Sequence, residues 1–510
     1  MATSSPPPED RCAIARDLRP PLQGEVGRSA SRRSFLTGAA AFAAASTTRL
    51  GGGLHAKELA PPAEPGPQRV VTIDLAAAER PLALPCFGGA TLPTWTLSES
   101  DWLPVVDLMI GERLDVRFEN RLPREGEHTS LHWHGIRLPN DQDGVPYLTQ
   151  EPVLPGEQFN YSFVPPDTGS FFFHPHCNTA EQLGRGLAGL LIVKGDETEP
   201  YDADMPIVFR DWRTNDAGDS FLPFLTPEGA GKAGSFGTIR STNGQINPEI
   251  ELPAGGDCRL RLYNLDNTRV MEIGIEDAEA AIVAIDGIAL VPFPLKSWRL
   301  GPAMRADVVL RAPADGKTVR LVDYFAPEPV PLVRLTGRGE DTRTIPFDPA
   351  PLRAGRIAAP DLQNAERMTL AFSATATAEA IAEAESQGFL LDSLCAASGA
   401  FWAINKQVWP VGDHSRIPPP LATLRLGQTY RFELQNLTPH QHPIHIHGHS
   451  FKVLGSSRRD LPIHHADTVL LQPKERVDVA FVADNPGDWM LHCHIIEHQE
   501  TGMMGYFRIA

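Results

Sequence analysis

Polar and apolar residues alternate along many short stretches of this chain, and one kind of stretch recurs three times. Its copies are residues 111–120, 256–264 and 427–436, and each opens on glycine and ends on asparagine, a residue that favours turns. Alternation with a period of two is typical of a β-strand that buries one face. The chain also holds 47 prolines and 43 glycines, which suits many short strands joined by turns. The pattern predicts an all-β protein of three consecutive Greek-key β-sandwich domains of one type.

We place the predicted domains at residues 68–196, 204–340 and 365–510, after a leader at 1–56. One stretch, from Thr375 to Gln387, departs from the strand pattern because it is rich in alanine and glutamate. These residues are strong helix formers, so this stretch predicts a helix on the surface of the third domain.

Ten histidines, one cysteine and one methionine form four short clusters near the two ends of the chain, and the middle repeat has no histidine. Imidazole and thiolate are ligands that copper prefers. The first and third domains are therefore predicted to hold metal, and the second to position them. The clusters read His132-Trp-His134, His174-Pro-His176, His442-Pro-Ile-His445-Ile-His447, and His492-Cys493-His494 with His498 and Met503 downstream.

The spacing within the clusters predicts two separate sites. Residues two apart on a strand project from the same face, so each of the four His-x-His pairs can direct both rings at one metal centre. Eight imidazoles are enough for several metal ions. Cys493 lies between two paired histidines, so its sulfur should point to the opposite face. His442 lies an odd number of residues before the third pair and should face the same way. Two histidines, a cysteine and a weak axial methionine form the blue-copper set, here His442, Cys493, His498 and Met503.

The motifs HWHG, HPH, HPIHIHG and HCHIIEHQETGMM occur in this order, and through them the chain resembles the multicopper oxidases, the laccase-like family. The resemblance runs from about Val70 to the C-terminus, and every ligand position is filled. It implies cupredoxin domains and four coppers per chain: one type 1, one type 2 and two type 3. The type 1 copper takes the blue-copper set above. The type 2 copper takes His132 and His445. The type 3 pair takes His134, His174, His176, His447, His492 and His494. Four other histidines match no ligand position and are expected to support the sites or lie on the surface: His440, His449, His464 and His465.

The resemblance also implies the reaction. The type 1 copper takes electrons singly from a donor, Cys493 and its flanking histidines pass them on, and the trinuclear centre reduces dioxygen to water with four electrons and four protons. Asp143, in the NDQDG segment after HWHG, matches the family's acidic residue near type 2 and predicts a proton route. The alternative for Asp143 is an ordinary turn residue. Many bacterial members carry glutamate where Gln499 stands, and Glu497 and Glu500 are neighbouring candidates to replace it.

The identity of the electron donor is predicted less directly than the metal sites. The chain has nine methionines and no methionine cluster beyond Met503-Met504, whereas cuprous oxidases of this family carry a methionine-rich insertion. This favours phenols and aromatic amines as donors, with cuprous or manganous oxidation in copper tolerance as the alternative. Zinc competes for an isolated Cys/His cluster. Two other classes of protein fit the sequence less well. A copper-free scaffold protein on the same fold would have lost ligands, and none is lost here. A copper nitrite reductase would have two domains, and three are predicted here.

The formal net charge of −17 disfavours nucleic acid and anionic membranes as partners. Residues 1–56 are basic by contrast, and Arg32-Arg33 precede an alanine-rich run from Thr37 to Ser46. This is typical of a signal for the twin-arginine export machinery, and the run is too short to span a bilayer. We therefore expect a periplasmic or secreted protein without a membrane span in its mature form.

Four cysteines remain besides Cys12 of the leader and the copper ligand: Cys86, Cys177, Cys258 and Cys395. In an oxidising compartment they have three ways to pair if all are bridged, and free buried thiols are the alternative.

Overall fold

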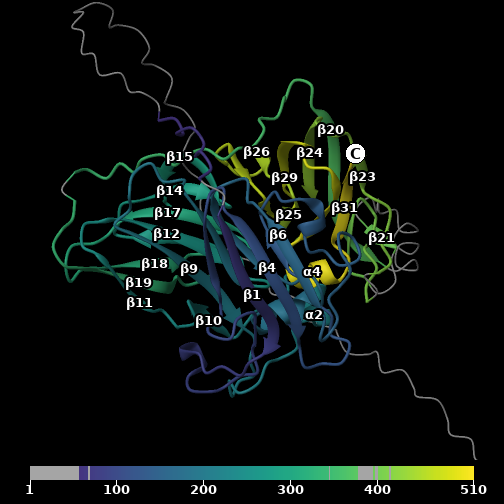
Figure 1. The fold of residues 1–510 in the computed structure, drawn as a ribbon, viewed down its shortest axis with the longest axis horizontal. Helices are drawn as coiled ribbons and strands as arrows, with labels where there is room; N and C mark the ends of the chain where they lie inside the picture. Colours follow the sequence, from purple (N-terminus) through teal and green to yellow (C-terminus); the bar gives the residue numbers. More distant parts are fainter. Residues whose placement is uncertain (1–56, 67–68, 344, 377–393, 397–399, 413–414) are drawn as a thin grey trace, which may run out of the picture. The chain divides into compact units, whose positions relative to one another are not determined.

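The computed structural model describes residues 57–66, 69–343, 345–376, 394–396, 400–412 and 415–510. Within these ranges the regular structure is mainly β, in six sheets, and each sheet takes its strands from one of three successive stretches of the chain (Figure 1). The first stretch is purple to blue in the figure, the second teal, and the third green to yellow. The α-helices are short: α1 (Thr179–Arg185), α2 (Pro227–Ala230) and α4 (Ile496–Glu500). No described helix has the length and apolar character needed to cross a membrane.

The first stretch carries two histidine clusters on neighbouring strands of one sheet. That sheet has the order β3 (Val105–Met109), β8 (Gly189–Lys194), β7 (Gly169–His174) and β5 (His132–His134). The other sheet has the order β2 (Trp95–Thr96), β1 (Val70–Glu79), β4 (Arg113–Arg121) and β6 (Gln158–Phe163). Two 3-10 turns, η1 (Pro85–Phe87) and η2 (Asn140–Gln142), lie in the connections. Strands β5 and β7 pair antiparallel with His132 opposite His174. Strand register alone therefore brings these two clusters together.

The second stretch has no cluster, and its central strand is buried at every position. Its larger sheet has the order β10 (Ile239–Thr242), β9 (Ala203–Trp212), β12 (Asp257–Asn264), β17 (Arg305–Arg311), β14 (Ala280–Ile285) and β15 (Ile288–Pro294). The smaller has the order β11 (Glu249–Pro253), β19 (Val330–Arg338), β18 (Thr318–Asp323), β13 (Met271–Glu276) and β16 (Trp298–Leu300). In β12, Arg259 and Arg261 alternate with leucines yet are buried. The polar face of this strand is covered by other parts of the molecule, because Arg261 donates to the Ser170 hydroxyl of β7.

The third stretch carries the remaining clusters on one sheet, ordered β23 (Ala422–Leu424), β31 (Met504–Ile509), β30 (Gly487–Cys493), β25 (His442–Ile446) and β28 (Thr468–Leu471). The other sheet has the order β21 (Leu394–Ala396), β20 (Glu366–Ala376), β24 (Thr429–Asn436), β29 (Arg476–Val482), β26 (Phe451–Ser456) and β27 (His464–Ala466), with β22 (Trp402–Ile404) on β20. Strands β25 and β30 pair antiparallel with His445 opposite His492 and Ile444 opposite Cys493.

The helix expected from Thr375 to Gln387 is wrong at its start, because Thr375 and Ala376 complete strand β20. The rest of that prediction lies outside the described residues. The leader at 1–56 also lies outside them. The exact domain boundaries stay a prediction.

The threefold repeat seen in the sequence has a structural counterpart. Strands β4, β12 and β24 each lie between a parallel neighbour and an antiparallel neighbour. The asparagine at or next to the end of each strand donates its amide to two backbone carbonyls and accepts from the backbone N–H two residues on; these residues are Asn120, Asn264 and Asn436. Asn436 thereby binds the carbonyl of His440 at 2.6 Å, just before the third histidine cluster.

Three of the four cysteines left open are settled. Cys86, Cys177 and Cys258 are buried free thiols. The disulfide alternative therefore fails for these three.

Candidate metal centre

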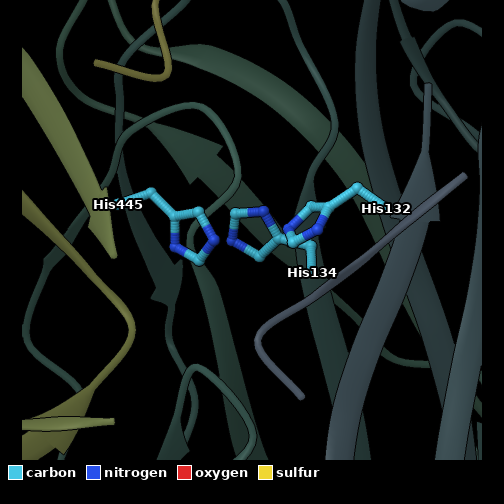
Figure 2. Close-up of side chains that lie close together, drawn as sticks. All are labelled: His132, His134 and His445. Carbon is cyan, nitrogen blue, oxygen red and sulfur yellow. The ribbon is translucent and has the colours of Figure 1, made fainter. Parts of the chain in front are cut away.

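All four His-x-His pairs meet in one buried cluster, to which the first and third stretches contribute equally. Each of the eight side chains is at most 4% exposed. Figure 2 shows His132, His134 and His445 with their rings close together. The His134 ring stacks on His445 with centroids 3.7 Å apart, and the His132 ring stacks on His447 at 3.8 Å. The cluster thus joins two parts of the chain that share no sheet.

The ring nitrogens of this cluster form three trios, in each of which the ligand atoms lie within 4.8 Å of one another. They are His132, His134 and His445; His134, His174 and His494; and His176, His447 and His492. Each trio mixes histidines from both stretches. Neither stretch alone can complete a trio.

Hydrogen bonds orient four of these rings through Nδ1. A backbone carbonyl can only accept, so an Nδ1 that faces one carries the proton and Nε2 is left with its lone pair. The bonds are from His132 to Asp143 O at 2.8 Å, His174 to Pro175 O at 2.9 Å, His445 to Asp467 O at 2.9 Å, and His492 to Cys493 O at 3.0 Å.

The inward nitrogens fit metal ions. Buried polar atoms almost always have a hydrogen-bond partner, because an unpaired one costs free energy. Among the described residues, seven ring nitrogens in this cluster have none: His132 Nε2, His134 Nδ1, His174 Nε2, His176 Nε2, His445 Nε2, and both nitrogens of His494. Burial also lowers the pKa of His134, His174 and His176 well below 6.5, so the rings are neutral near pH 7. A set of neutral imidazoles with unused lone pairs matches the ligand chemistry of copper.

A second group lies on the other face of strand β30. The Sγ atom of Cys493 is 3.5 Å from Nδ1 of His442 and 3.7 Å from Nδ1 of His498, and the two Nδ1 atoms are 3.1 Å apart. Met503 is fully buried, and its backbone bonds both Cys493 and His498. The structure therefore brings His442, Cys493 and His498 together, apart from the eight-histidine cluster, and Met503 adjoins them through its backbone.

The outer nitrogens of this second group are held by other parts of the chain. His442 Nε2 lies 2.7 Å from the Thr438 hydroxyl, and His498 Nε2 donates to the carbonyl of Lys232 at 2.8 Å. Burial lowers the pKa of His498 to about 3 and raises the pKa of the Cys493 thiol. Metal binding therefore has to displace the thiol proton, as thiolate sites in proteins require.

Asp143 is fully buried beside the histidine cluster. Its Oδ2 accepts from His447 Nδ1 at 2.9 Å. Its Oδ1 lies 3.3 Å from His132 Nδ1 and has no hydrogen-bond partner in the part of the chain that the structure describes. One carboxylate therefore touches histidines of both stretches. This is more than the contacts of an ordinary turn aspartate.

Gln499 stands at the position where glutamate was expected from the family resemblance. Gln499 and its neighbours Glu497 and Glu500 have different surroundings in the structure. Gln499 donates weakly to the Thr179 hydroxyl at 3.4 Å, and its buried Oε1 has no partner among the residues described. Glu500 accepts from the backbone N–H of Thr179, three residues after His176. Glu497 binds a segment of the second stretch beside His498. Of the two glutamates, Glu500 is the one bonded to the segment that carries a cluster histidine.

A buried ion pair beside the cluster was missed by sequence reasoning. Asp467 lies 3.1 Å from His134 Nε2 and accepts from Arg305 Nη2 at 2.6 Å, while Asp286 accepts from the Arg305 backbone N–H. Burial and the nearby Asp467 raise the pKa of Asp286 to about 7. Burial opposes ionisation of Asp467 as well, but Arg305 and His445 hold its pKa below the usual range. Nothing in the sequence marks Arg305, which lies in the repeat that has no ligands.

The four histidines that match no ligand position near the sites, His440, His449, His464 and His465, take no part in the ligand groups found among the described residues. His449 is buried against Phe481 and Trp489, and the His464 ring lies against Trp298. His440 lies beside Trp402, near the second group. His465 is partly buried.

A β-sheet protein with a Cys-His₂ group one residue away from a cluster of eight histidines has the architecture of a copper oxidoreductase. The comparisons agree. The chain matches three profiles described as multicopper oxidase, at residues 86–198, 204–321 and 396–510. Multicopper oxidase MmcO of Mycobacterium tuberculosis is 30% identical, over 93% of this chain and 96% of that protein.

Two solved structures extend the comparison. A multicopper oxidase from Pseudomonas thermotolerans is 37% identical with a TM-score of 0.76, covering 87% of this chain and 100% of that one. The laccase-like multicopper oxidase CueO from Ochrobactrum sp. is 25% identical with a TM-score of 0.69, covering 89% and 100%. The chain belongs to the multicopper oxidase family: it is a copper-dependent oxidoreductase that oxidises a donor and reduces dioxygen. The prediction of three consecutive cupredoxin-like domains is confirmed.

We predict that Asp467→Ala destabilises the fold and weakens metal binding at the histidine cluster. Removing one partner of a buried ion pair costs about 3–5 kcal/mol, and loss of a carboxylate that orients a ligand histidine weakens metal binding roughly 10–100-fold. Denaturant unfolding of the copper-free protein and a copper titration measure the two effects. The control is Asp488→Ala, which removes a carboxylate from the exposed pair with Arg508. Equal unfolding free energies and equal copper affinities in the two variants would refute the role assigned to Asp467.

Proposed function

We propose that the protein is a laccase-like oxidase that takes single electrons from phenols or aromatic amines and delivers four of them to dioxygen. The observation that carries this proposal is the position of Cys493 on strand β30, between His492 and His494. Its sulfur belongs to one ligand group, while its two neighbours belong to the other. A donor-facing group and a dioxygen-reducing cluster are thus joined by the shortest covalent path a protein offers.

The ligand assignment follows the two groups. His442, Cys493, His498 and Met503 would hold a type 1 copper. His132 and His445 would hold a type 2 copper. The two type 3 coppers would be held by His134, His174 and His494, and by His176, His447 and His492. Copper in these positions supplies one-electron redox chemistry and the four-electron reduction of dioxygen to water.

The protein's own residues orient the ligand histidines and deliver protons for dioxygen reduction. The carbonyls that accept from His132 and His445 fix the tautomers that present Nε2 to a metal. Asp143 orients His447, and its unpartnered Oδ1 is the atom we assign to proton delivery. Burial of both ligand groups keeps bulk water away from the reacting centre.

Two features of the chain and one relative support an aromatic donor. The chain has no methionine cluster beyond Met503-Met504 that would hold soft cuprous ions near the type 1 residues. Its acidic surface does not repel neutral or cationic aromatics. The Ochrobactrum relative is described as having oxidase activity towards lignin model compounds and lignosulfonate.

The copper-loaded protein should be blue and should lose its colour in Cys493→Ser. The intense visible band of a type 1 site comes from its thiolate–copper bond, and serine offers no thiolate. Visible absorption and copper analysis measure the two quantities, with four coppers expected in the native chain and three in the variant. The control is Cys258→Ser, which changes a buried free thiol of strand β12 that belongs to none of the ligand groups. A colourless native protein after copper loading would disprove the type 1 assignment.

Donor oxidation should proceed without added copper. We expect phenols such as dimethoxyphenols to be oxidised at the same rate with a copper chelator present and with excess copper. Oxygen consumption measures both cases. If phenol oxidation appears only with excess copper, and cuprous ion itself is oxidised fast, the enzyme is a metallo-oxidase instead.

Asp143→Asn should slow dioxygen reduction and leave reduction of the type 1 site by donor unchanged. An amide keeps the shape of the side chain but cannot carry the proton. Stopped-flow reduction without oxygen and steady-state turnover across acid to neutral pH separate the two steps. The control is Asp141→Asn, an exposed residue of the same turn. Equal turnover of both variants at every pH would contradict the role.

We also propose export of the folded, copper-loaded protein by the twin-arginine route, supported by Arg32-Arg33 ahead of the alanine-rich run. Changing both arginines to lysine should retain the protein in the cytoplasm, as cell fractionation would show. Unchanged periplasmic yield would count against this route.

A further inference from the structure

The outer wall of the Cys493 group is a segment of the second stretch, residues 226–235, which contains helix α2. Two side chains of the third stretch donate hydrogen bonds to the backbone of this segment. His498 Nε2 donates to Lys232 O at 2.8 Å, and Trp402 Nε1 donates to Ala230 O at 2.6 Å. The Trp402 ring also lies against both histidines of the group, with centroids 4.5 Å from His498 and 5.2 Å from His442.

A third side chain, Glu497, holds both ends of the same segment. Its Oε1 accepts from the backbone N–H of Thr226 at 2.8 Å and from the Ser235 hydroxyl at 3.0 Å, and its Oε2 accepts from the Ser235 backbone N–H. Thr226 and Ser235 are also bonded to each other through their hydroxyls, at 2.9 Å. One carboxylate therefore closes the segment into a loop and fastens it beside His498.

Glu497 is 1% exposed, and no cation pairs with it among the described residues. Burying a carboxylate without a cation costs free energy unless hydrogen bonds compensate. All the hydrogen bonds its carboxylate accepts come from segment 226–235. Glu497 lies next to a ligand histidine. Among the described residues its carboxylate is bonded only to a stretch that has no ligands. These two facts indicate a role beyond simple packing.

We propose that Glu497 is a positioning residue, which latches segment 226–235 over the type 1 group so that the Lys232 carbonyl fixes the ring of His498. The His498 edge is then closed to direct contact, and a donor meets this segment instead of the ring. The inference deepens the proposed function, since it assigns the donor-facing wall of the same site.

Two substitutions disturb the contact between Glu497 and segment 226–235, one on each side of it. In Glu497→Gln the amide keeps one acceptor oxygen and turns an N–H₂ toward the donors of segment 226–235. In Gly229→Ala the new methyl group would lie 2.2 Å from the Ser235 hydroxyl and 2.5 Å from Glu497 Oε2. Gly229 lies in helix α2, where alanine is favoured over glycine, so the backbone itself is not strained. The matched control is Glu228→Gln, which removes an exposed carboxylate from the same helix.

The first measurement is amide hydrogen exchange in the copper-free protein. Both latch variants should speed exchange in segment 226–235 by about tenfold or more, the equivalent of one lost hydrogen bond to a charged group. Glu228→Gln should leave it unchanged. This result does not depend on copper and therefore stands or falls separately from the proposed function.

The second measurement uses the copper-loaded protein. With the Lys232 carbonyl released, the thiolate–copper absorption band and the type 1 potential should shift in both latch variants, and KM for an aromatic donor should change more than kcat. A purely structural role would lower thermal stability without moving the band or the potential. The proposal is overturned if exchange is unchanged in both variants, or if exchange rises while band, potential and KM stay at native values. A native protein without a thiolate band would defeat the copper assignment and leave the exchange result intact.

Discussion

The guanidinium of Arg305 is the group on which the arrangement of the copper site depends. It is fully buried in the second stretch and reaches Asp467 of the third stretch and the Ser170 carbonyl of the first. A buried charge is tolerated only when its partners are in place, and an unpaired one costs several kcal/mol. A displaced stretch would therefore leave Arg305 and Asp467 uncompensated. The ligand-free domain thereby specifies how the two ligand-bearing domains meet.

The same principle recurs at the other ligand group. Glu497 and His498 of the third stretch reach into the second stretch, and neither finds its partners near it in the sequence. Polar contacts between stretches, and not only packing of apolar faces, hold the histidines in place. This explains why a domain without copper ligands separates the two that have them.

The fold, and the division of the candidate ligand residues into two groups, could be predicted from the sequence because both rest on short-range periodicity. A spacing of two on a strand decided which rings share a face, and the alternation of apolar residues gave the strands. The membership of each histidine trio depends on strand register between distant segments and did not follow from spacing. Asp467, Arg305 and Glu497 have no local signature, since their partners lie far along the chain. In β12 the alternation of arginine and leucine suggested a solvated face, but tertiary contacts bury it.

The order of the histidine clusters along the chain has a consequence for biosynthesis. Every trio needs histidines from both the first and the third stretch, and His445, His492 and His494 follow the whole second stretch in the chain. Domains fold in order as they leave the ribosome, so the first stretch must wait with His132 and His174 unliganded while the second is completed. The nascent chain therefore has no finished binding site for most of its synthesis. The eight-histidine cluster can therefore be completed only after the third stretch has been synthesised.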